Sequence, residues 1–351
     1  MSETWATRSL RPSLTPCWNE RVIIMTVLII TKSDDNESIE FVTDAIKERG
    51  GSAFRLDTDR FPTEVKLAAR YGKDSEQLVM ASEQGELDLR TVSAVWHRRL
   101  NIGGKLPPDM DRQVRSAAIG ESRATLLGML ASLKVFRMDE HEKIKRAGNK
   151  QLQLQVAREV GLSIPRTLIT NDPQAVRDFA KTCENGLITK MLSSFAIYEE
   201  GQEKVVFTNR VAPEHLEKLE GLRLCPMTFQ EMVPKALELR VTIVGKRAFA
   251  ASIDSQSSER GSLDWRRDGA GLLRNWERYE LPGEVEQRLM RLMDYFGLNY
   301  GAIDIIVPPD GRHIFLEVNP VGEFFWLERC PGLPISGSIA DVLLGRGYRR
   351  A

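Results

Sequence analysis

Residues 299–326 read NYGAIDIIVPPDGRHIFLEVNPVGEFFW and place two acidic side chains, Asp304 and Glu317, inside apolar runs. Residues 302–307 and 313–318 predict two buried strands, joined by a turn with Asp-Gly at its tip. A hairpin of this kind brings the two acids together. A buried carboxylate without a partner costs several kcal/mol, so the pair requires a cation or a shared proton.

A third oxygen donor follows the second acid. Asn319 stands two residues after Glu317, so on a strand both side chains point to the same face. Two carboxylates and one amide carbonyl suit Mg²⁺ better than Zn²⁺, and Mg²⁺ usually keeps positions open for substrate phosphates. We therefore predict a metal–nucleotide site with Asp304, Glu317 and Asn319 as metal ligands. The alternative is a hairpin whose acids pair with lysine or arginine, and these residues alone do not separate the two.

The composition limits the class of protein. The chain has 351 residues, too many for one ordinary core, and suggests two or three packed lobes. Its 49 basic and 49 acidic side chains create no overall field that would attract nucleic acid or a membrane surface. The four cysteines lack CxxC spacing, which argues against a zinc cluster or a disulfide framework and favours a cytoplasmic location. No run of about 18 apolar residues occurs, so we expect no membrane-spanning helix.

The first part of the chain predicts a βαβ arrangement. Residues 26–31 form a short apolar run typical of a buried parallel strand, residues 39–49 are amphipathic, and residues 53–56 begin a second strand. The intervening loop lacks the glycines of a dinucleotide fingerprint, which argues against a Rossmann cofactor site. Farther along, residues 140–161 predict one long helix closed by a glycine.

Charged residues follow the strands of this first unit. Asp57, Asp59 and Arg60 fall at a predicted strand end, as does the VWHRR run at residues 95–99. Open α/β sheets present ligand contacts at such ends. Solvated strand ends explain the same pattern equally well.

We divide the chain into an extension and three domains. Residues 1–24 are expected to be disordered, because they lack an apolar core and Met25 stands directly before the first strand. A second boundary is expected at Pro234, which follows a strand end. The expected domains are an N-terminal α/β domain over residues 25–139, a central domain over 140–233 and a C-terminal domain with the acidic hairpin over 234–351.

Four cationic side chains complement the acidic hairpin. They are Lys150, Lys190, Arg240 and Arg266. A lysine inside a strand, such as Lys190, needs an anion or must reach water, and phosphate is the anion we favour. Lysine neutralises phosphate as a point charge, arginine binds it in two-pronged fashion, and the acids hold a bridging metal. Each cation alone is more simply a surface charge, and only the combination points to a metal-bound triphosphate.

Known phosphate and nucleophile motifs are absent from the sequence. There is no Walker A sequence, no HRD or DFG triplet, no GxSxG and no HExxH. Phosphate handling therefore requires another fold. The strand end at residues 230–233, made of Gln230, Glu231, Met232 and Val233, is expected to offer main-chain groups to an adenine edge.

The order of these residues resembles that of the ATP-grasp carboxylate–amine ligases from Met25 onward. The resemblance rests on Lys150, Gly161, Pro165, Lys190, QEMV at 230–233, ELR at 238–240, GAID at 301–304 and LEVNP at 316–320. Longer segments look closest to the microviridin-type peptide maturases, and more narrowly to the branch that forms side-chain esters. These segments are LDTDRFPTEV, VWHRR, NKQLQLQVAREVGLSIP, TKMLSSFAIY, CPMTFQE, PKALELRVTIVG and the hairpin itself.

The resemblance implies an α/β protein with an ATP-grasp fold, preceded by an N-terminal pre-ATP-grasp α/β domain. Such enzymes use ATP and Mg²⁺ to phosphorylate an Asp or Glu side chain of a ribosomal precursor peptide. A Ser or Thr hydroxyl of the same peptide then attacks the acyl phosphate and closes a macrolactone. The family also implies a helical leader on the precursor, and dimerisation.

The resemblance also assigns roles to individual residues. Lys150 and Lys190 would contact ATP phosphates, and Glu231 and Val233 would lie at the adenine hinge. Glu238 and Arg240 would lie beside the ribose–phosphate region, with Arg240 and Arg266 as catalytic residues and Arg266 stabilising the acyl phosphate. Asp304, Glu317 and Asn319 would hold Mg²⁺.

The segment after Lys190 departs from the wider superfamily. Many ATP-grasp proteins have a glycine-rich flap there, whereas MLSSFAIYEEG supplies Ser193 and Ser194 and no glycine before Gly201. The phosphate contacts of this flap are left unassigned. We expect the leader to bind at residues 198–206, although an exposed hairpin explains that stretch equally well.

Several other functions remain open at this point. A lactam-forming sister enzyme or a RimK-like amino-acid ligase would share the same site. A nucleotide-binding regulator without turnover would share the fold, and a kinase acting on a small polyol would share the phosphate chemistry. Ester and amide closures both lose water, but only esters yield to mild base.

Overall fold

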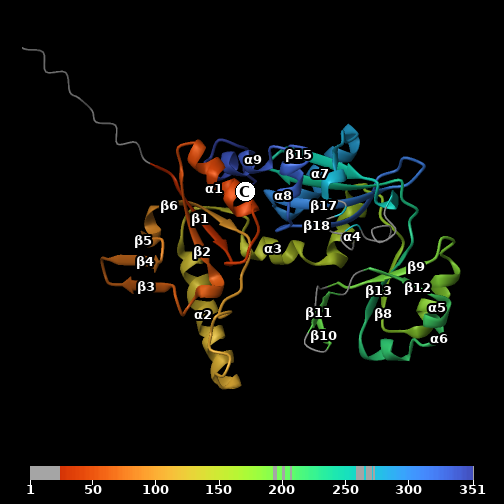
Figure 1. Cartoon of the computed structure of the whole chain (residues 1–351), viewed down its shortest axis with the longest axis horizontal. Coiled ribbons are helices and arrows are strands. Elements are labelled where there is room, and N and C mark those ends of the chain that lie inside the picture. Colours follow the sequence, from red (N-terminus) through yellow and green to blue (C-terminus); the bar gives the residue numbers. More distant parts are fainter. Residues whose placement is uncertain are drawn as a thin grey trace, which may run out of the picture.

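Three groups of elements follow one another along the chain (Figure 1). The computed structural model describes residues 24–192, 196–199, 202–205, 208–257, 265, 271 and 273–350. Almost all of the N-terminal extension that we expected to be disordered therefore lies outside the described residues. Within the described ranges, no helix is both long enough and apolar enough to cross a membrane.

The N-terminal group is built on a parallel sheet of four strands in the order β2-β1-β6-β7. Its central strand β1 is the apolar run predicted from the sequence, and residues 27–30 are fully buried. Helix α1 packs against the sheet through an apolar face that includes Ile39 and Val42. The elements are β1 (Thr26–Thr31), α1 (Ser38–Glu48), β2 (Ser52–Asp57), β6 (Val92–His97) and β7 (Phe136–Met138).

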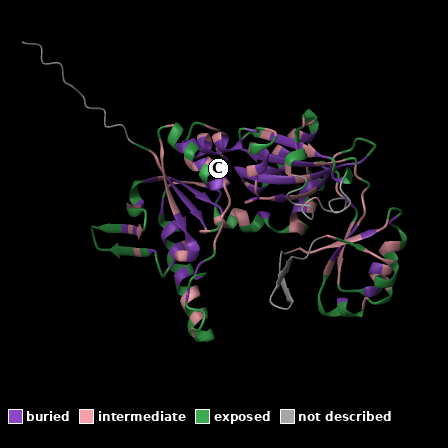
Figure 2. Cartoon of the chain, in the orientation of Figure 1, coloured by how far each residue is buried: buried purple, intermediate pink, exposed green. Residues whose placement is uncertain are grey.

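Two parts of this group extend away from the sheet. An antiparallel meander, β3 (Lys66–Tyr71), β4 (Glu76–Ser82) and β5 (Gly85–Asp88), projects at the left of Figure 1. Helix α2 (Arg112–Ser132) runs downward, and Figure 2 shows that its lower end is mostly exposed. Its N-terminus is capped by the Asp111 side chain, which accepts hydrogen bonds from two main-chain amides.

The expected long helix over residues 140–161 is wrong, because the chain forms two helices there. These are α3 (His141–Ala147) and α4 (Lys150–Glu159). Asn149 lies between them in an extended conformation, and its side chain accepts a hydrogen bond from the Leu152 amide at 3.0 Å. An asparagine cap of this kind starts a new helix, so the apolar periodicity continues across a break in the backbone.

The central group is a smaller antiparallel sheet in the order β12-β9-β13-β8, at the lower right of Figure 1. A separate hairpin of β10 and β11 stands beside it. The elements are β8 (Thr167–Thr170), α5 (Pro173–Lys181), β9 (Leu187–Lys190), β10 (Ala196–Glu199), β11 (Gln202–Val205), β12 (Asn209–Val211), α6 (Pro213–Glu217) and β13 (Met227–Glu231).

The C-terminal group contains the predicted acidic hairpin within an antiparallel sheet, in the order β16-β15-β14-β17-β18. The hairpin strands are β17 (Tyr300–Val307) and β18 (Ile314–Asn319), and Asp304 is paired with Glu317 across them, as the sequence predicted. The other elements are β14 (Leu237–Val244), β15 (Arg247–Ile253), β16 (Glu277–Arg278), α7 (Gly283–Phe296), α8 (Phe325–Arg329) and α9 (Ile335–Leu343).

The two faces of this sheet belong to different cores. One face packs on α7 and on residues of α3 and α4, including Val156 and Leu289. The other face packs on α8 and α9 in a core that also contains Val27 and Ile39 of the N-terminal group. Helix α9 lies against α1, and these two helices join the parallel and antiparallel sheets (Figure 1).

A buried carboxylate also joins the N-terminal group to the start of β17. Asp139 is 3% exposed and accepts hydrogen bonds from the main-chain amides of Asn299 and Tyr300 at 2.9–3.0 Å. The Asn299 side chain donates another at 2.9 Å. Burial raises the pKa of Asp139 to about 6, although these hydrogen bonds oppose the rise.

Replacing this carboxylate by an apolar group is expected to destabilise the fold. In Asp139→Leu the buried amides of Asn299 and Tyr300 lose their acceptor, which should lower the free energy of unfolding by about 3 kcal/mol. Urea denaturation measures the change. Asp310→Leu, at the exposed hairpin tip, is the control and should lose much less. Equal losses in the two variants would contradict the assignment.

Candidate functional site

Each of the two acids in the hairpin forms an ion pair with a cation from another element. Arg240 of β14 is the cross-strand neighbour of Asp304, and its Nη1 lies 2.8 Å from Asp304 Oδ1. Lys150, the first residue of α4, places its Nζ 3.0 Å from Glu317 Oε2. Two of the predicted cations therefore meet two of the predicted acids. These contacts are the lysine and arginine pairing that the alternative interpretation of the hairpin expects.

Arg240 is held on several sides. Its side chain is 9% exposed, because β14 lies inside the sheet between β15 and β17. Nη2 donates to the carbonyl of Glu323 at 3.0 Å, and the guanidinium lies 5.6 Å from the Trp326 ring centre. Burial lowers the pKa of Arg240, but the Asp304 carboxylate reverses this effect, and the net pKa is raised. A buried, fully charged arginine can hold Asp304 in one position.

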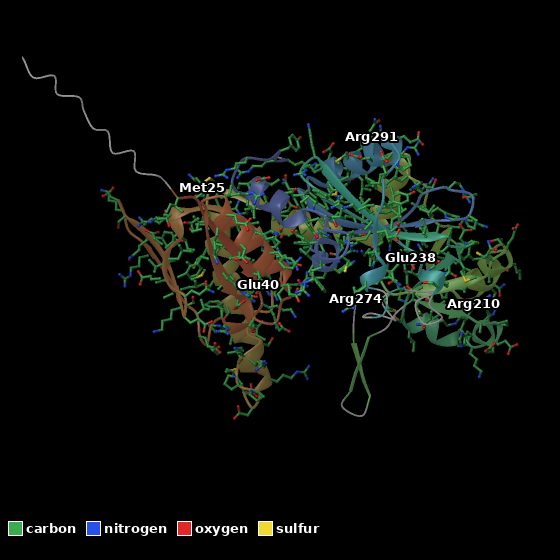
Figure 3. The ribbon with its side chains drawn as sticks, turned by 45° about the horizontal axis from the view of Figure 1, so that its top comes forward. Met25, Glu40, Arg210, Glu238, Arg274 and Arg291 are labelled. Carbon is green, nitrogen blue, oxygen red and sulfur yellow. The ribbon has the colours of Figure 1, made fainter. Side chains whose placement is uncertain are left out.

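A pocket opens between the central sheet and the C-terminal sheet. Eight of the predicted site residues line it: Lys190, Gln230, Glu231, Met232, Val233, Glu238, Asp304 and Glu317. Figure 3 shows Glu238 where the green central group meets the blue C-terminal sheet. The pocket is also lined by residues that were not predicted as site residues: Pro165, Ile188, Thr208, Lys235, Trp265, Ile306 and Leu316.

The strand end at residues 230–233 forms one wall of the pocket. Gln230 is 1% exposed, and its amide nitrogen donates to Thr167 Oγ1 at 2.8 Å. The main-chain amide of Glu231 donates to the Arg166 carbonyl at 3.0 Å, and that of Met232 to the Gly186 carbonyl at 2.9 Å. These two amides are therefore used within the protein. The expected adenine contacts would fall to other main-chain groups of the segment.

Lys235 and Glu238 form a largely buried ion pair in the pocket wall. Lys235 Nζ lies 2.8 Å from Glu238 Oε1, with 8% and 13% of the two side chains exposed. The spacing of a lysine and a glutamate three residues apart was visible in the sequence. The family resemblance placed Glu238 in the site, whereas Lys235 was not predicted there.

The remaining predicted residues lie beside the pocket or outside the described part of the chain. Asn319 follows Glu317 on β18, and its Oδ1 accepts a hydrogen bond from the Val321 amide at 3.1 Å. Arg266 lies outside the described residues. The expected leader surface at 198–206 lies partly outside them, although the strands β10 and β11 pair as an antiparallel hairpin.

The donor set of the hairpin fits a hard divalent cation. Asp304 and Glu317 are cross-strand partners and both line the pocket, and Asn319 adds an amide oxygen. Carboxylate and amide oxygens are the donors that Mg²⁺ prefers, at a site that leaves positions open to phosphate. Among the described residues, no group of three or more His, Cys, Asp or Glu side chains could hold a metal. A magnesium site would therefore need the amide and the nucleotide as further ligands.

A charged cluster that was not predicted from the sequence joins the end of β6 to the loop after β18. Glu323 lies in the loop after β18, and its Oε2 is 2.7 Å from Arg98 Nη2. Arg99 forms an ion pair with the same carboxylate, and the Asn36 side chain donates a hydrogen bond to it. Burial raises the pKa of the Glu323 carboxyl, but Arg98 and Arg99 outweigh it, and the net pKa is below the ordinary value. The VWHRR run at a strand end was the available signal. Nothing in the sequence pointed to its partner more than 200 residues away.

Comparison with known proteins places the chain in one family. Residues 26–145 match the model of the MvdD pre-ATP grasp domain. The structure of macrocyclase MdnC from Microcystis aeruginosa MRC, bound with precursor peptide MdnA, is 52% identical with a TM-score of 0.83. The alignment covers 92% of this chain and all of that one.

Two further relatives extend the comparison. A RiPP-associated ATP-grasp ligase from Chryseobacterium gregarium, in complex with ADP and a leader and core peptide, is 39% identical with a TM-score of 0.89. That alignment covers 93% of this chain and 98% of the other. A probable alpha-L-glutamate ligase from Vibrio parahaemolyticus is 25% identical over 215 residues, which is 59% of this chain and 67% of the relative.

The fold is therefore the ATP-grasp fold with an N-terminal pre-ATP-grasp domain, as the sequence predicted. The chain belongs to the family of RiPP-associated ATP-grasp ligases and macrocyclases, where RiPP denotes a ribosomally synthesised and post-translationally modified peptide.

The low pKa of Glu323 leads to a prediction about acid stability. Because its folded pKa lies below the ordinary value of 4.5, its ion pairs stabilise the fold above that pH and lose this effect as the pH falls through the folded pKa. Glu323→Gln should therefore be less stable than the wild type at pH 7, and the difference should shrink by about pH 3. Urea unfolding at both pH values measures it. A difference that stays constant or grows on acidification would contradict the assignment.

Proposed function

We propose that the protein is an ATP-dependent ligase that closes macrolactone rings in a ribosomal precursor peptide. It would activate Asp or Glu side chains of that peptide as acyl phosphates and join them to Ser or Thr hydroxyls. The proposal rests chiefly on one pocket, in which the acidic hairpin, Lys190 and the strand end at residues 230–233 come together. The ADP and peptides in the Chryseobacterium gregarium relative support the same reading.

The chain's cations are suited to hold a triphosphate. Lys190 lines the pocket, and Lys150 reaches Glu317 on its edge. Ammonium groups at these two points would neutralise phosphate oxygens as point charges. The lining of Ile188, Ile306 and Leu316 supplies apolar surface for a nucleobase, and the main chain of residues 231–233 lies beside it.

Asp304, Glu317 and Asn319 would hold Mg²⁺. When bound, the ion would spread the charge of the transferring phosphoryl group. Arg240 would act through Asp304, with which it is paired across β14 and β17. Glu238, held by Lys235, would lie beside the ribose. Arg266 would stabilise the acyl phosphate.

The proposed reaction balances in two steps. A carboxylate oxygen of the peptide attacks the γ-phosphorus of ATP, the bond to the β-phosphate oxygen breaks, and ADP leaves. A hydroxyl oxygen of the same peptide then attacks the acyl carbon, and the bond from that carbon to the phosphate oxygen breaks. The departing phosphate takes up the hydroxyl proton and leaves as inorganic phosphate. One ATP is consumed and one water is lost for each ring. The residues around the pocket supply position and charge, and no covalent enzyme intermediate is required.

Several organisational features belong to this proposal. The domain boundaries at residues 25–139, 140–233 and 234–351 would separate the pre-ATP-grasp domain from the two halves that enclose the nucleotide. A leader helix on the precursor would bind away from the chemistry, at or near the β10–β11 hairpin. A homodimer is proposed from the family alone.

The metal-binding assignment predicts a large loss of turnover in two variants. Asp304→Asn and Glu317→Gln keep the side-chain shape but remove the charge that Mg²⁺ requires, so ADP formation should fall by about a hundredfold or more. The assay would use a Thr-, Ser-, Asp- and Glu-rich peptide encoded beside this chain. Asp310→Asn, at the exposed tip of the same hairpin, is the matched control and should retain activity. Wild-type turnover in both site variants would rule out the assignment.

The chemistry of closure predicts products that mild base reopens. Mass spectrometry should show the peptide lighter by one water per ring, and each ring should regain a water after mild alkaline treatment because it is an ester. Rings that resist base would identify the lactam-forming sister chemistry. A peptide made heavier by an added amino acid would identify a RimK-like ligase, and a phosphorylated product a kinase. Nucleotide binding without ADP formation would identify a regulator.

A further inference from the structure

We propose that Arg98, Arg99 and Glu323 form a clasp by which the N-terminal domain positions the Mg²⁺-binding residues of the hairpin. The inference deepens the proposed function and rests on it. None of these three residues lines the nucleotide pocket. They are positioning residues, and their effect would reach the site through Asn319 and through Arg240.

The clasp joins the end of β6 to the loop after β18. Each arginine binds both the Glu323 carboxylate and main-chain carbonyls of that loop. Arg98 Nη2 lies 2.7 Å from Glu323 Oε2, while its Nη1 donates to the Gly322 carbonyl at 3.1 Å. Arg99 also pairs with Glu323, and its Nη1 donates to the Val321 carbonyl at 2.8 Å. The loop is therefore held at three consecutive residues.

One path from the clasp leads to Asn319. The amide of Val321 donates to Asn319 Oδ1 at 3.1 Å, and the carbonyl of the same residue receives Arg99. Val321 thus binds the asparagine on one side and the arginine on the other. A shift of this residue would turn the amide oxygen that is proposed as a metal ligand.

A second path leads to Asp304. The carbonyl of Glu323 accepts a hydrogen bond from Arg240 Nη2 at 3.0 Å, and Arg240 Nη1 binds Asp304 at 2.8 Å. Gly322 lies close against the same arginine. A Cβ added to it would lie 2.4 Å from the Ala302 Cβ and 2.9 Å from Arg240 Nη2. The loop and Arg240 consequently cannot move independently.

The three side chains of the clasp differ in burial, so removing each one has a different structural cost. The Arg98 side chain is 1% exposed, whereas Arg99 and Glu323 are 25% and 28% exposed. Removing the Glu323 charge leaves the buried guanidinium of Arg98 with less opposite charge to balance it. Removing Arg99 is milder, because water can reach its place. The two variants therefore probe the same clasp at different structural cost.

The test compares ADP affinity in Mg²⁺ with ADP affinity in excess chelator, by isothermal titration calorimetry on the whole chain. Loss of the groups that orient metal ligands costs typically tenfold or more in metal affinity. We expect Glu323→Gln and Arg99→Ala to lose about tenfold of the Mg²⁺-dependent gain in ADP affinity, with the affinity in chelator unchanged. Gly322→Ala should act in the same direction. Arg99→Lys, which keeps the charge but not the fork, should recover only part.

The control variant breaks a different ion pair between the same domains. Arg49, which follows the last residue of α1, lies 2.6 Å from Asp341 of α9, and neither residue lines the nucleotide pocket. Arg49→Ala should lower stability without altering the Mg²⁺-dependent gain. Clasp variants that keep the full gain, or that lose affinity equally with and without Mg²⁺, would overturn the inference.

The outcomes also separate this inference from the proposed function. A wild-type chain that binds ADP more tightly in Mg²⁺ but never closes a ring would count against the proposed reaction alone. A wild-type chain that does not bind ADP would overturn both.

Discussion

The ion pair between the buried Arg240 and the partly exposed Asp304 is the contact on which the site depends. Arg240 points out of an interior strand into a region with little water, so its charge requires a partner, and Asp304 lies directly across the neighbouring strand. Removing Asp304 would leave the buried charge of Arg240 without its carboxylate partner, which is far more costly than losing an exposed pair. The same requirement holds the Asp304 carboxylate at the edge of the pocket. The ion pair that satisfies the buried charge therefore also sets the geometry of the site.

A second constraint comes from the way the sheets are joined. The parallel N-terminal sheet and the antiparallel C-terminal sheet share a core through α1 and α9 (Figure 1). Because interiors are closely packed, a shared core transmits position from one sheet to the other. Asp139 strengthens the junction by accepting hydrogen bonds at the start of β17. The N-terminal domain thus takes part in placing the hairpin, although the pocket itself lies between the other two groups.

The elements that the sequence predicted well are those with strong periodicity or clear turn residues. Strand β1 is a short apolar run, and the acidic hairpin has two apolar strands around an Asp-Gly turn. The break between α3 and α4 was missed, because the apolar pattern continues through Asn149 and the cap depends on one side chain. The meander β3–β5 was missed because its outer strands β3 and β5 are largely exposed and carry a weak pattern, and only β4 buries side chains, at Leu78 and Met80.

By itself, the sequence determined which chemical groups are available: two acids inside apolar strands, an amide two residues after the second, and cations elsewhere with no partner in sight. The alternation of apolar and polar side chains along the two hairpin strands also determined that Asp304 and Glu317 would face each other. Only the tertiary structure decided which cation meets which acid, and that Arg98 and Arg99 hold Glu323. Partners of this kind lie far apart along the chain, so no local pattern encodes them. They are selected when packing buries a charge, because a charge removed from water must then find its counterpart.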